Sequence, residues 1–207
     1  MTGRILETAS DLAEGVAWLR AQDPRLAPAL NLELPLRRRA QGFRELLWAI
    51  TGQQLSTASA AACWDRIEAA GYTTPRAVAA ASEDDLRAAG FSRQKARYAR
   101  ALAAADIDYP ALRGLADAEV VATLIAVPGI GRWTAEIYAA FSLGRADVLP
   151  AGDLALQEAA RRLLALDDRP CEREMRNLAA LWSPWRGVAA RALWAYYRVA
   201  TMREGTR

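Results

Sequence analysis

Apolar residues recur every three or four positions along most of the chain, and this is the spacing of an amphipathic helix. One example is the run Phe43, Leu46, Leu47 and Ile50. Sustained alternation of apolar and polar residues, which indicates a half-buried strand, is absent, and so is the Asn-Gly pair of a tight hairpin. The sequence therefore predicts an all-α protein, a bundle of helices joined by short turns.

Polar residues with cap-forming side chains precede most of the helical stretches. The expected N-caps are Ser10, Ser82 and Asp117, and further helices are expected to begin at about Ser56, Thr74 and Ser92. The expected helices run over about residues 56–70, 92–105, 117–126, 132–141, 153–165, 173–182 and 186–201, with another ending near residues 51–52.

The composition excludes several kinds of catalytic chemistry. The chain has no histidine, so histidine-activated nucleophiles, histidine bases and the usual zinc sites are ruled out. Two cysteines, Cys63 and Cys171, are too few for a disulfide framework or a four-thiolate iron–sulfur cluster. Any reaction must use carboxylates, hydroxyls, backbone groups or the single lysine, Lys95.

Two further features bear on location and partners. No apolar run reaches the roughly eighteen residues of a membrane span, and acidic residues near the start do not fit a signal peptide, so we expect a cytoplasmic protein without a membrane partner. The net charge is only +3, but residues 161–207 carry ten arginines against five acids. Clustered arginines suit phosphate binding, although a solvated helix face explains each cluster equally well.

The stretch from Leu124 to Ala135 is the most informative part of the sequence. Two expected helices meet across Pro128-Gly129-Ile130-Gly131. Glycines allow a sharp turn and a close approach of a ligand, and the unpaired amides that open the second helix point outward at its positive end. Such a turn can hold a phosphate through backbone groups alone, whereas a lone pair of glycines would indicate only close helix packing.

In full, Pro-Gly-Ile-Gly-Arg-x-Thr-Ala resembles the helix–hairpin–helix of DNA repair glycosylases, and most closely the DNA-3-methyladenine glycosylase II family. The resemblance runs from about residue 36 to 200. Besides the hairpin, it rests on the blocks at residues 49–56, 88–96, 147–153 and 183–186, the last followed by Trp194. Larger members carry an additional N-terminal β-rich domain, so we expect this chain to be a compact form.

The resemblance implies a helix–hairpin–helix glycosylase fold with two helical lobes flanking a cleft. The expected first lobe combines about residues 1–50 and 148–207. The expected central lobe covers about residues 51–147 and contains the hairpin at 124–135.

The resemblance assigns catalysis to Asp153, which ends the block Asp147-Val-Leu-Pro-Ala-Gly-Asp153. Cleavage of an N-glycosidic bond builds positive charge on the sugar, and a nearby carboxylate stabilises that state. An alkylated purine is already cationic and leaves without a general acid, which fits a chain without histidine. From position alone, a helix N-cap is the preferred interpretation of Asp153; the resemblance favours catalysis, and the two roles are compatible.

Trp133 occupies the position at which bifunctional relatives resembling endonuclease III carry a lysine that forms a Schiff base. Because tryptophan forms no imine, the resemblance implies a monofunctional hydrolase that leaves an abasic site. Trp133 and Trp194 are expected to form walls of a pocket that attracts a cationic purine through their indole faces, with Tyr138 as a further pocket candidate. For Trp194, a role in the hydrophobic core is as good an interpretation.

The target base must leave the duplex, and a side chain must fill the gap. By alignment, the segment with Gln53, Gln54 and Leu55 supplies this wedge, with Gln54 as first choice. The residues expected to bind DNA are Gly129, Gly131, Thr134, Arg132, Gln53, Gln54 and Leu55. No cofactor is expected, but the resemblance places a monovalent cation at the backbone carbonyls of Ile125, Val127 and Ile130.

The sequence thus predicts a monomeric DNA glycosylase that removes alkylated purines of the 3-methyladenine and 7-methylguanine type from double-stranded DNA during base excision repair. Three alternatives stay open. They are a glycosylase for oxidised or mismatched bases, a non-enzymatic helix–hairpin–helix module that binds DNA, and a helical protein-interaction domain.

Overall fold

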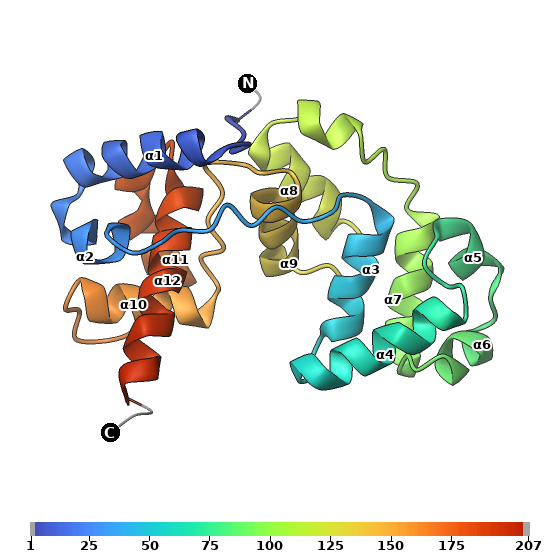
Figure 1. The fold of residues 1–207 in the computed structure, drawn as a ribbon. Coiled ribbons are helices and arrows are strands. Elements are labelled where there is room, and N and C mark those ends of the chain that lie inside the picture. The colour runs from blue at the N-terminus through green and yellow to red at the C-terminus, as the bar shows by residue number, and fades with distance from the viewer. Residues whose placement is uncertain (1–2, 205–207) are drawn as a thin grey trace. The chain divides into compact units, whose positions relative to one another are not determined.

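The computed structural model describes residues 3–204, and in that range the chain forms twelve α-helices together with short 3-10 segments and one π segment (Figure 1). Within the same range, β-type pairing is limited to an isolated bridge between Ile5 and Arg145. The all-α prediction is confirmed. None of the helices in the described residues is long and apolar enough to cross a membrane.

Backbone contacts divide the chain into two compact units. The first unit combines the residues up to Arg38 with those from Ala139 onward, and the second unit is the continuous segment Arg39–Tyr138. The boundaries drawn from the sequence, near residues 50 and 147, fall later in the chain than these.

The first unit is built around its longest helix, α12. This helix packs against α1, α2 and α10, so that both ends of the chain contribute to one unit (Figure 1). The helices of the first unit are α1 (Ala9–Gln22), α2 (Ala27–Leu30), α10 (Leu154–Leu163), α11 (Glu172–Leu178) and α12 (Arg186–Glu204), with 3-10 segments at Pro24–Leu26 and Ala179–Trp182.

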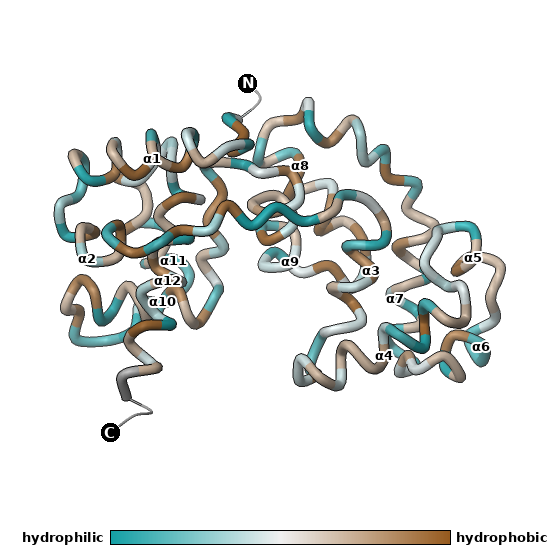
Figure 2. Tube along the Cα trace, in the orientation of Figure 1, coloured by the Kyte–Doolittle hydropathy of each residue, from teal (hydrophilic) through white to brown (hydrophobic). Residues whose placement is uncertain are grey.

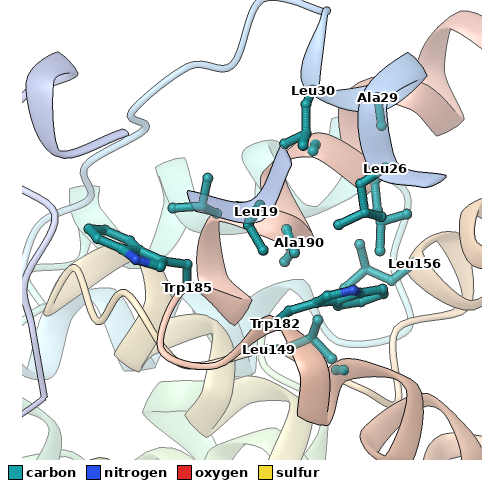
Figure 3. Packing of buried hydrophobic residues seen from close by; sticks show 14 of the residues in the cluster. Leu19, Leu26, Ala29, Leu30, Leu149, Leu156, Trp182, Trp185 and Ala190 are labelled. Atoms are coloured by element: carbon teal, nitrogen blue, oxygen red, sulfur yellow. The ribbon is translucent and has the colours of Figure 1, made fainter. Parts of the chain in front are cut away.

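Trp182 lies at the centre of the hydrophobic core of the first unit. Its side chain is fully buried, and Figure 3 shows its ring beside Leu26, Leu149 and Leu156. The indole Nε1 donates a hydrogen bond of 3.0 Å to the buried carboxylate of Asp23. A buried indole N–H needs such an acceptor, so this contact keeps the core free of an unsatisfied donor.

The second unit has α7 at its centre, in contact with α3, α5 and α6. Hydrophobic and hydrophilic residues are interspersed within its helices, as expected for amphipathic helices around a core (Figure 2). Its helices are α3 (Phe43–Gly52), α4 (Thr57–Ala69), α5 (Pro75–Ala80), α6 (Glu83–Ala88), α7 (Arg93–Ala104), α8 (Asp117–Ile125) and α9 (Arg132–Ile137), with a 3-10 segment at Ala111–Gly114. Helix α9 continues directly into the π segment Tyr138–Ser142.

Of the three predicted N-caps, Ser82 is confirmed, and Ser56, Thr74 and Ser92, each at the predicted start of a helix, also act as N-caps. The other two predictions are wrong. Thr8, rather than Ser10, caps α1, because the Asp11 side chain accepts the Thr8 N–H at 2.8 Å and completes a capping box. Asp117 is the first residue of α8 and not its cap, since Glu119 instead accepts the N–H of Ala116 at 2.8 Å.

Candidate functional site

The predicted hairpin is present in the second unit, where α8 and α9 pack against each other. The turn between them closes through a 3.0 Å hydrogen bond from the Ile130 N–H to the Val127 carbonyl. Gly129 has a φ of +94°, and a Cβ on it would lie 2.3 Å from Cγ of Tyr98 in α7. Only glycine fits this position, because both the backbone conformation and the contact with Tyr98 exclude a side chain.

Gly131 differs from Gly129 in that no neighbour excludes a side chain at its position. It is the N-cap residue of α9, it offers no side chain to the helix, and nothing lies within 4 Å of where its Cβ would be. The fold itself therefore does not require glycine here. The first-turn N–H groups of a helix have no acceptor within that helix, so an exposed Gly131 leaves room for an acceptor from outside.

The other residues predicted for α9 differ in accessibility. Trp133 is 48% exposed and so does not belong to the core, and Arg132 lies on the surface 3.9 Å from Glu136. Thr134 and Tyr138 are buried. The Tyr138 hydroxyl accepts the N–H of Gly42 at 2.8 Å, and burial raises the pKa of this tyrosine.

The predicted wedge segment forms the turn between α3 and α4, residues 53–56, which we call the wedge turn. Gln54 has a φ of +57°, a left-handed conformation that is uncommon for a residue other than glycine. Gln54 and Leu55 are both exposed, Leu55 by 42%. Gln53 instead turns inward, and its Nε2 donates a 2.8 Å hydrogen bond to the Gly129 carbonyl of the hairpin.

The basic residues Arg93, Lys95 and Arg97 follow one another along α7, and each has a partner within the second unit. The Lys95 ammonium donates to the Thr51 carbonyl at 2.6 Å, near the end of α3, and desolvation lowers the pKa of Lys95. Arg93 and Arg97 lie 3.5 and 3.8 Å from Glu83. These contacts attach α7 to α3 through Lys95 and to α6 through Arg93 and Arg97.

Asp153 lies in the first unit, where it is the N-cap of α10 and is partly buried. Its Oδ1 accepts the N–H groups of Ala155 and Leu156, both at 3.0 Å. The Nε1 of Trp194, in α12, donates to the same oxygen at 3.2 Å. Three N–H donors thus hold one carboxylate at the positive end of a helix, which is a favourable place for a negative charge.

Hydrogen bonds on both sides fix the turn before Asp153. The Asp153 N–H donates to the Pro150 carbonyl at 2.9 Å, and the buried Gln157 donates to the Ala151 carbonyl at 2.8 Å. Further upstream, Asp147 accepts both the backbone N–H and the guanidinium of Arg186, at 3.2 and 2.8 Å. The turn is therefore attached to α10 at one end and to the start of α12 at the other.

Trp194 is partly buried, and its ring centroid lies 5.4 Å from that of Phe141 at an interplanar angle of 37°. The buried guanidinium of Arg191 lies 4.7 Å from the Phe141 ring and donates to the Ala140 carbonyl at 3.0 Å. Burial lowers the pKa of Arg191 to about 10. These contacts fix the indole of Trp194 against the first unit while its N–H is directed at Asp153.

The structure thus assembles the predicted site residues into two groups. The hairpin and the wedge turn meet in the second unit through Gln53, and Asp153 and Trp194 meet in the first unit. Sequence reasoning gave no role to Gln157 or Asp147. The one available signal for Gln157 was a polar residue at a position of α10 that faces the core.

In the described part of the chain, no group of three or more cysteine, aspartate or glutamate side chains is arranged to hold a metal ion. The expected cation ligands are backbone carbonyls, and one of them, that of Val127, accepts the Ile130 N–H.

The sequence and the fold of this chain are both similar to known proteins. Residues 47–185 match the HhH-GPD superfamily base excision DNA repair protein family. The fold superimposes on the crystal structure of a DNA-3-methyladenine glycosidase from Bacillus halodurans with a TM-score of 0.81 and 31% identity, covering 96% of this chain and 94% of that one.

The chain is also similar to two further proteins. The 3-methyladenine DNA glycosylase Mag1 of Schizosaccharomyces pombe, solved in complex with abasic DNA, matches with a TM-score of 0.70 and 28% identity over 89% of this chain and 95% of that one. The Bacillus subtilis protein YfjP is 32% identical over 127 residues, which are 59% of this chain and 44% of YfjP, so the chain spans less than half the length of that relative. The predicted family is confirmed: the chain belongs to the HhH-GPD superfamily of base excision DNA repair proteins.

Proposed function

We propose that the protein is a monofunctional DNA glycosylase that hydrolyses the N-glycosidic bond of alkylated purines, of the 3-methyladenine and 7-methylguanine type, and leaves an abasic site. The observation that carries this proposal is the carboxylate of Asp153, held by three N–H donors at the start of α10. The 3-methyladenine glycosidase and glycosylase relatives support the substrate class.

The proposed reaction begins when the bond between the sugar C1′ and the purine nitrogen breaks and its electron pair leaves with the base. A cationic alkylated purine becomes neutral on leaving, so it needs no proton from the enzyme. The negative charge of Asp153 stabilises the positive charge that develops on the sugar, and it interacts less with the neutral ground-state sugar. Water then adds to C1′ and loses a proton, which gives the abasic sugar.

The absence of a lysine before Thr134 supports the monofunctional assignment. Trp133 stands there, and it is largely exposed at the start of α9. An indole cannot form a covalent imine with the sugar, but its electron-rich face attracts a cationic ring. Trp133 therefore contributes selectivity for the alkylated base, and no amine is placed there to cleave the strand.

DNA is held through the hairpin in this proposal. Its backbone N–H groups around Gly131 bind phosphate without reading sequence, and the exposed Gln54 and Leu55 fill the space of the flipped base. A single chain carries the hairpin, the wedge turn and the carboxylate, so we propose that it acts as a monomer. Affinity should fall steeply with salt because phosphate contacts release counterions.

The first prediction concerns Asp153. Asparagine keeps an oxygen that accepts the N–H groups of Ala155 and Leu156, so Asp153→Asn should remain folded with α10 capped. Because it lacks the negative charge, it should release 3-methyladenine and 7-methylguanine from methylated DNA at least about a hundredfold more slowly, as measured by chromatography of free bases. Asp65→Asn, an exposed change in α4, is the matched control. Full activity in Asp153→Asn would rule out the mechanism.

The second prediction concerns Trp194. Trp194→Phe retains an aromatic ring against Phe141 but removes the N–H that donates to Asp153. A lost hydrogen bond to a charged group predicts a base-release rate about tenfold lower with little change in DNA affinity. Trp48→Phe makes the same replacement in the second unit, where Trp48 contacts Trp64, and should keep the wild-type rate. Equal rates for all three proteins would show that the Trp194 N–H is not needed.

The third prediction separates the two hairpin glycines. Gly131→Ala should leave the thermal unfolding midpoint unchanged, because nothing lies within 4 Å of the added Cβ. The same methyl group stands where a phosphate would approach, so affinity for a short duplex should fall about tenfold, as measured by fluorescence anisotropy. Gly114→Ala also adds a Cβ to open space and should bind normally. If Gly131→Ala also binds normally, the phosphate does not lie against this residue.

The fourth prediction concerns a cation at the hairpin. We propose that the carbonyls of Ile125, Val127 and Ile130 hold a monovalent cation that bridges to a DNA phosphate. Replacing potassium with tetramethylammonium at constant ionic strength should then weaken duplex binding several-fold, because the larger ion does not fit between carbonyls. Binding that depends on ionic strength alone, whichever cation is present, would contradict the proposal.

A further inference from the structure

We infer that Gln53 is a positioning residue that fastens the wedge turn to the hairpin, so that the group entering the base stack and the group holding the phosphate behave as one rigid body. This inference rests on the proposed function, because it assigns a task to the hydrogen bond between Gln53 and Gly129 in base flipping. It concerns the second unit alone.

The contact adds a direct bond between two parts of the second unit that both also touch α7, which packs against α3 and places Tyr98 against Gly129. Helix α3, which leads into the wedge turn, packs against α4 and α7, whereas α8 packs against α9 in the hairpin. The Gln53 side chain spans 76 residues of sequence to reach the Gly129 carbonyl at 2.8 Å. It therefore forms a direct link between the helix pair that presents the wedge and the helix pair that forms the hairpin.

Both ends of this link are themselves held in place. At the hairpin end, Gly129 lies against the ring of Tyr98, whose hydroxyl accepts a 2.6 Å hydrogen bond from Gln94. At the wedge end, Lys95 donates to the Thr51 carbonyl at 2.6 Å, two residues before Gln53. Because both ends are held in place, the hydrogen bond between them fixes the distance between the wedge turn and the hairpin.

Gln54, the residue after Gln53, lies where the wedge turn reverses direction. Gln54 is exposed and has a φ of +57°, so the chain reverses sharply just where Gln53 is fastened. The donor of Gln53 is directed inward to the hairpin, while the side chains of Gln54 and Leu55 are exposed. One residue thus fixes the base of the turn, and the next two are presented to the solvent.

In base flipping, unstacking the target costs a few kcal/mol, and the wedge must enter at a fixed distance from the gripped phosphate. If the link is cut, the hairpin still binds phosphate and α3 stays attached to α7, but the wedge turn loses the bond that sets its distance from the hairpin. Nonspecific DNA affinity should therefore persist, while the equilibrium for flipping and the rate of base release should both fall. A residue that only stabilised the fold would not separate these properties.

The test compares Gln53→Leu and Gln53→Glu with the wild type. Both variants are close to glutamine in size, and neither donates a hydrogen bond to the Gly129 carbonyl when the carboxyl is ionised. Gln22→Leu, at the exposed end of α1, is the matched control. Three quantities are measured: affinity for an undamaged duplex, fluorescence of 2-aminopurine placed beside a tetrahydrofuran abasic site, and the single-turnover rate of base release from methylated DNA.

Both Gln53 variants should bind undamaged DNA within about twofold of the wild type. They should show a smaller rise in 2-aminopurine fluorescence and release bases about five- to tenfold more slowly at saturating enzyme, as expected for one lost hydrogen bond. Gln22→Leu should match the wild type in all three measurements. Having two variants guards against the chance that one of them fails to fold.

Wild-type fluorescence and rates in both Gln53 variants would overturn the inference. So would an equal loss of nonspecific affinity, because Gln53 would then belong to the phosphate grip itself. Failure of the proposed function has a different signature: the wild type would release no methylated base. In that case the binding and fluorescence measurements would still decide whether Gln53 couples the wedge turn to the hairpin.

Discussion

The proposed mechanism depends on the hydrogen bonds that hold the carboxylate of Asp153 in one place. Two amides of α10 and the indole N–H of Trp194 converge on its Oδ1. Gln157 of α10 donates to the Ala151 carbonyl and so attaches the preceding turn to α10. Asp147 joins the upstream loop to Arg186 of α12. In the proposed reaction, a chain without histidine uses one preorganised carboxylate, and such an arrangement suits a reaction in which a cation forms.

In the proposed function, the second unit holds DNA phosphate through backbone N–H groups of the hairpin. Gly129 is required by the fold, since its φ of +94° and its contact with Tyr98 exclude any side chain, whereas Gly131 has open space around it and is available to a ligand. The motif therefore contains one glycine that the fold requires and one that the proposed function assigns to DNA.

Local signals in the sequence predicted most of the helices. Ser82 caps a helix as expected, and Ser56, Thr74 and Ser92 cap helices where starts were predicted, because each accepts a backbone N–H within its own first turn. The errors arose where a neighbour competed, as when the pairing of Thr8 with Asp11 moved the first cap away from Ser10. The hydrogen bond from Gln53 to Gly129 joins residues 76 positions apart, and no local pattern encodes such a contact. The same holds for the Trp194 N–H, whose partner Asp153 lies 41 residues away.

The most direct test of the account is a crystal structure of the protein bound to a duplex that contains a cationic azasugar, a pyrrolidine whose ring nitrogen replaces C1′ of the abasic sugar. The account predicts that a carboxylate oxygen of Asp153 lies at hydrogen-bonding distance, roughly 3 Å, from the charged nitrogen. It also predicts that a phosphate of the same strand contacts the N–H groups after Gly131. An azasugar bound elsewhere, with Asp153 directed away from it, would contradict the proposed mechanism.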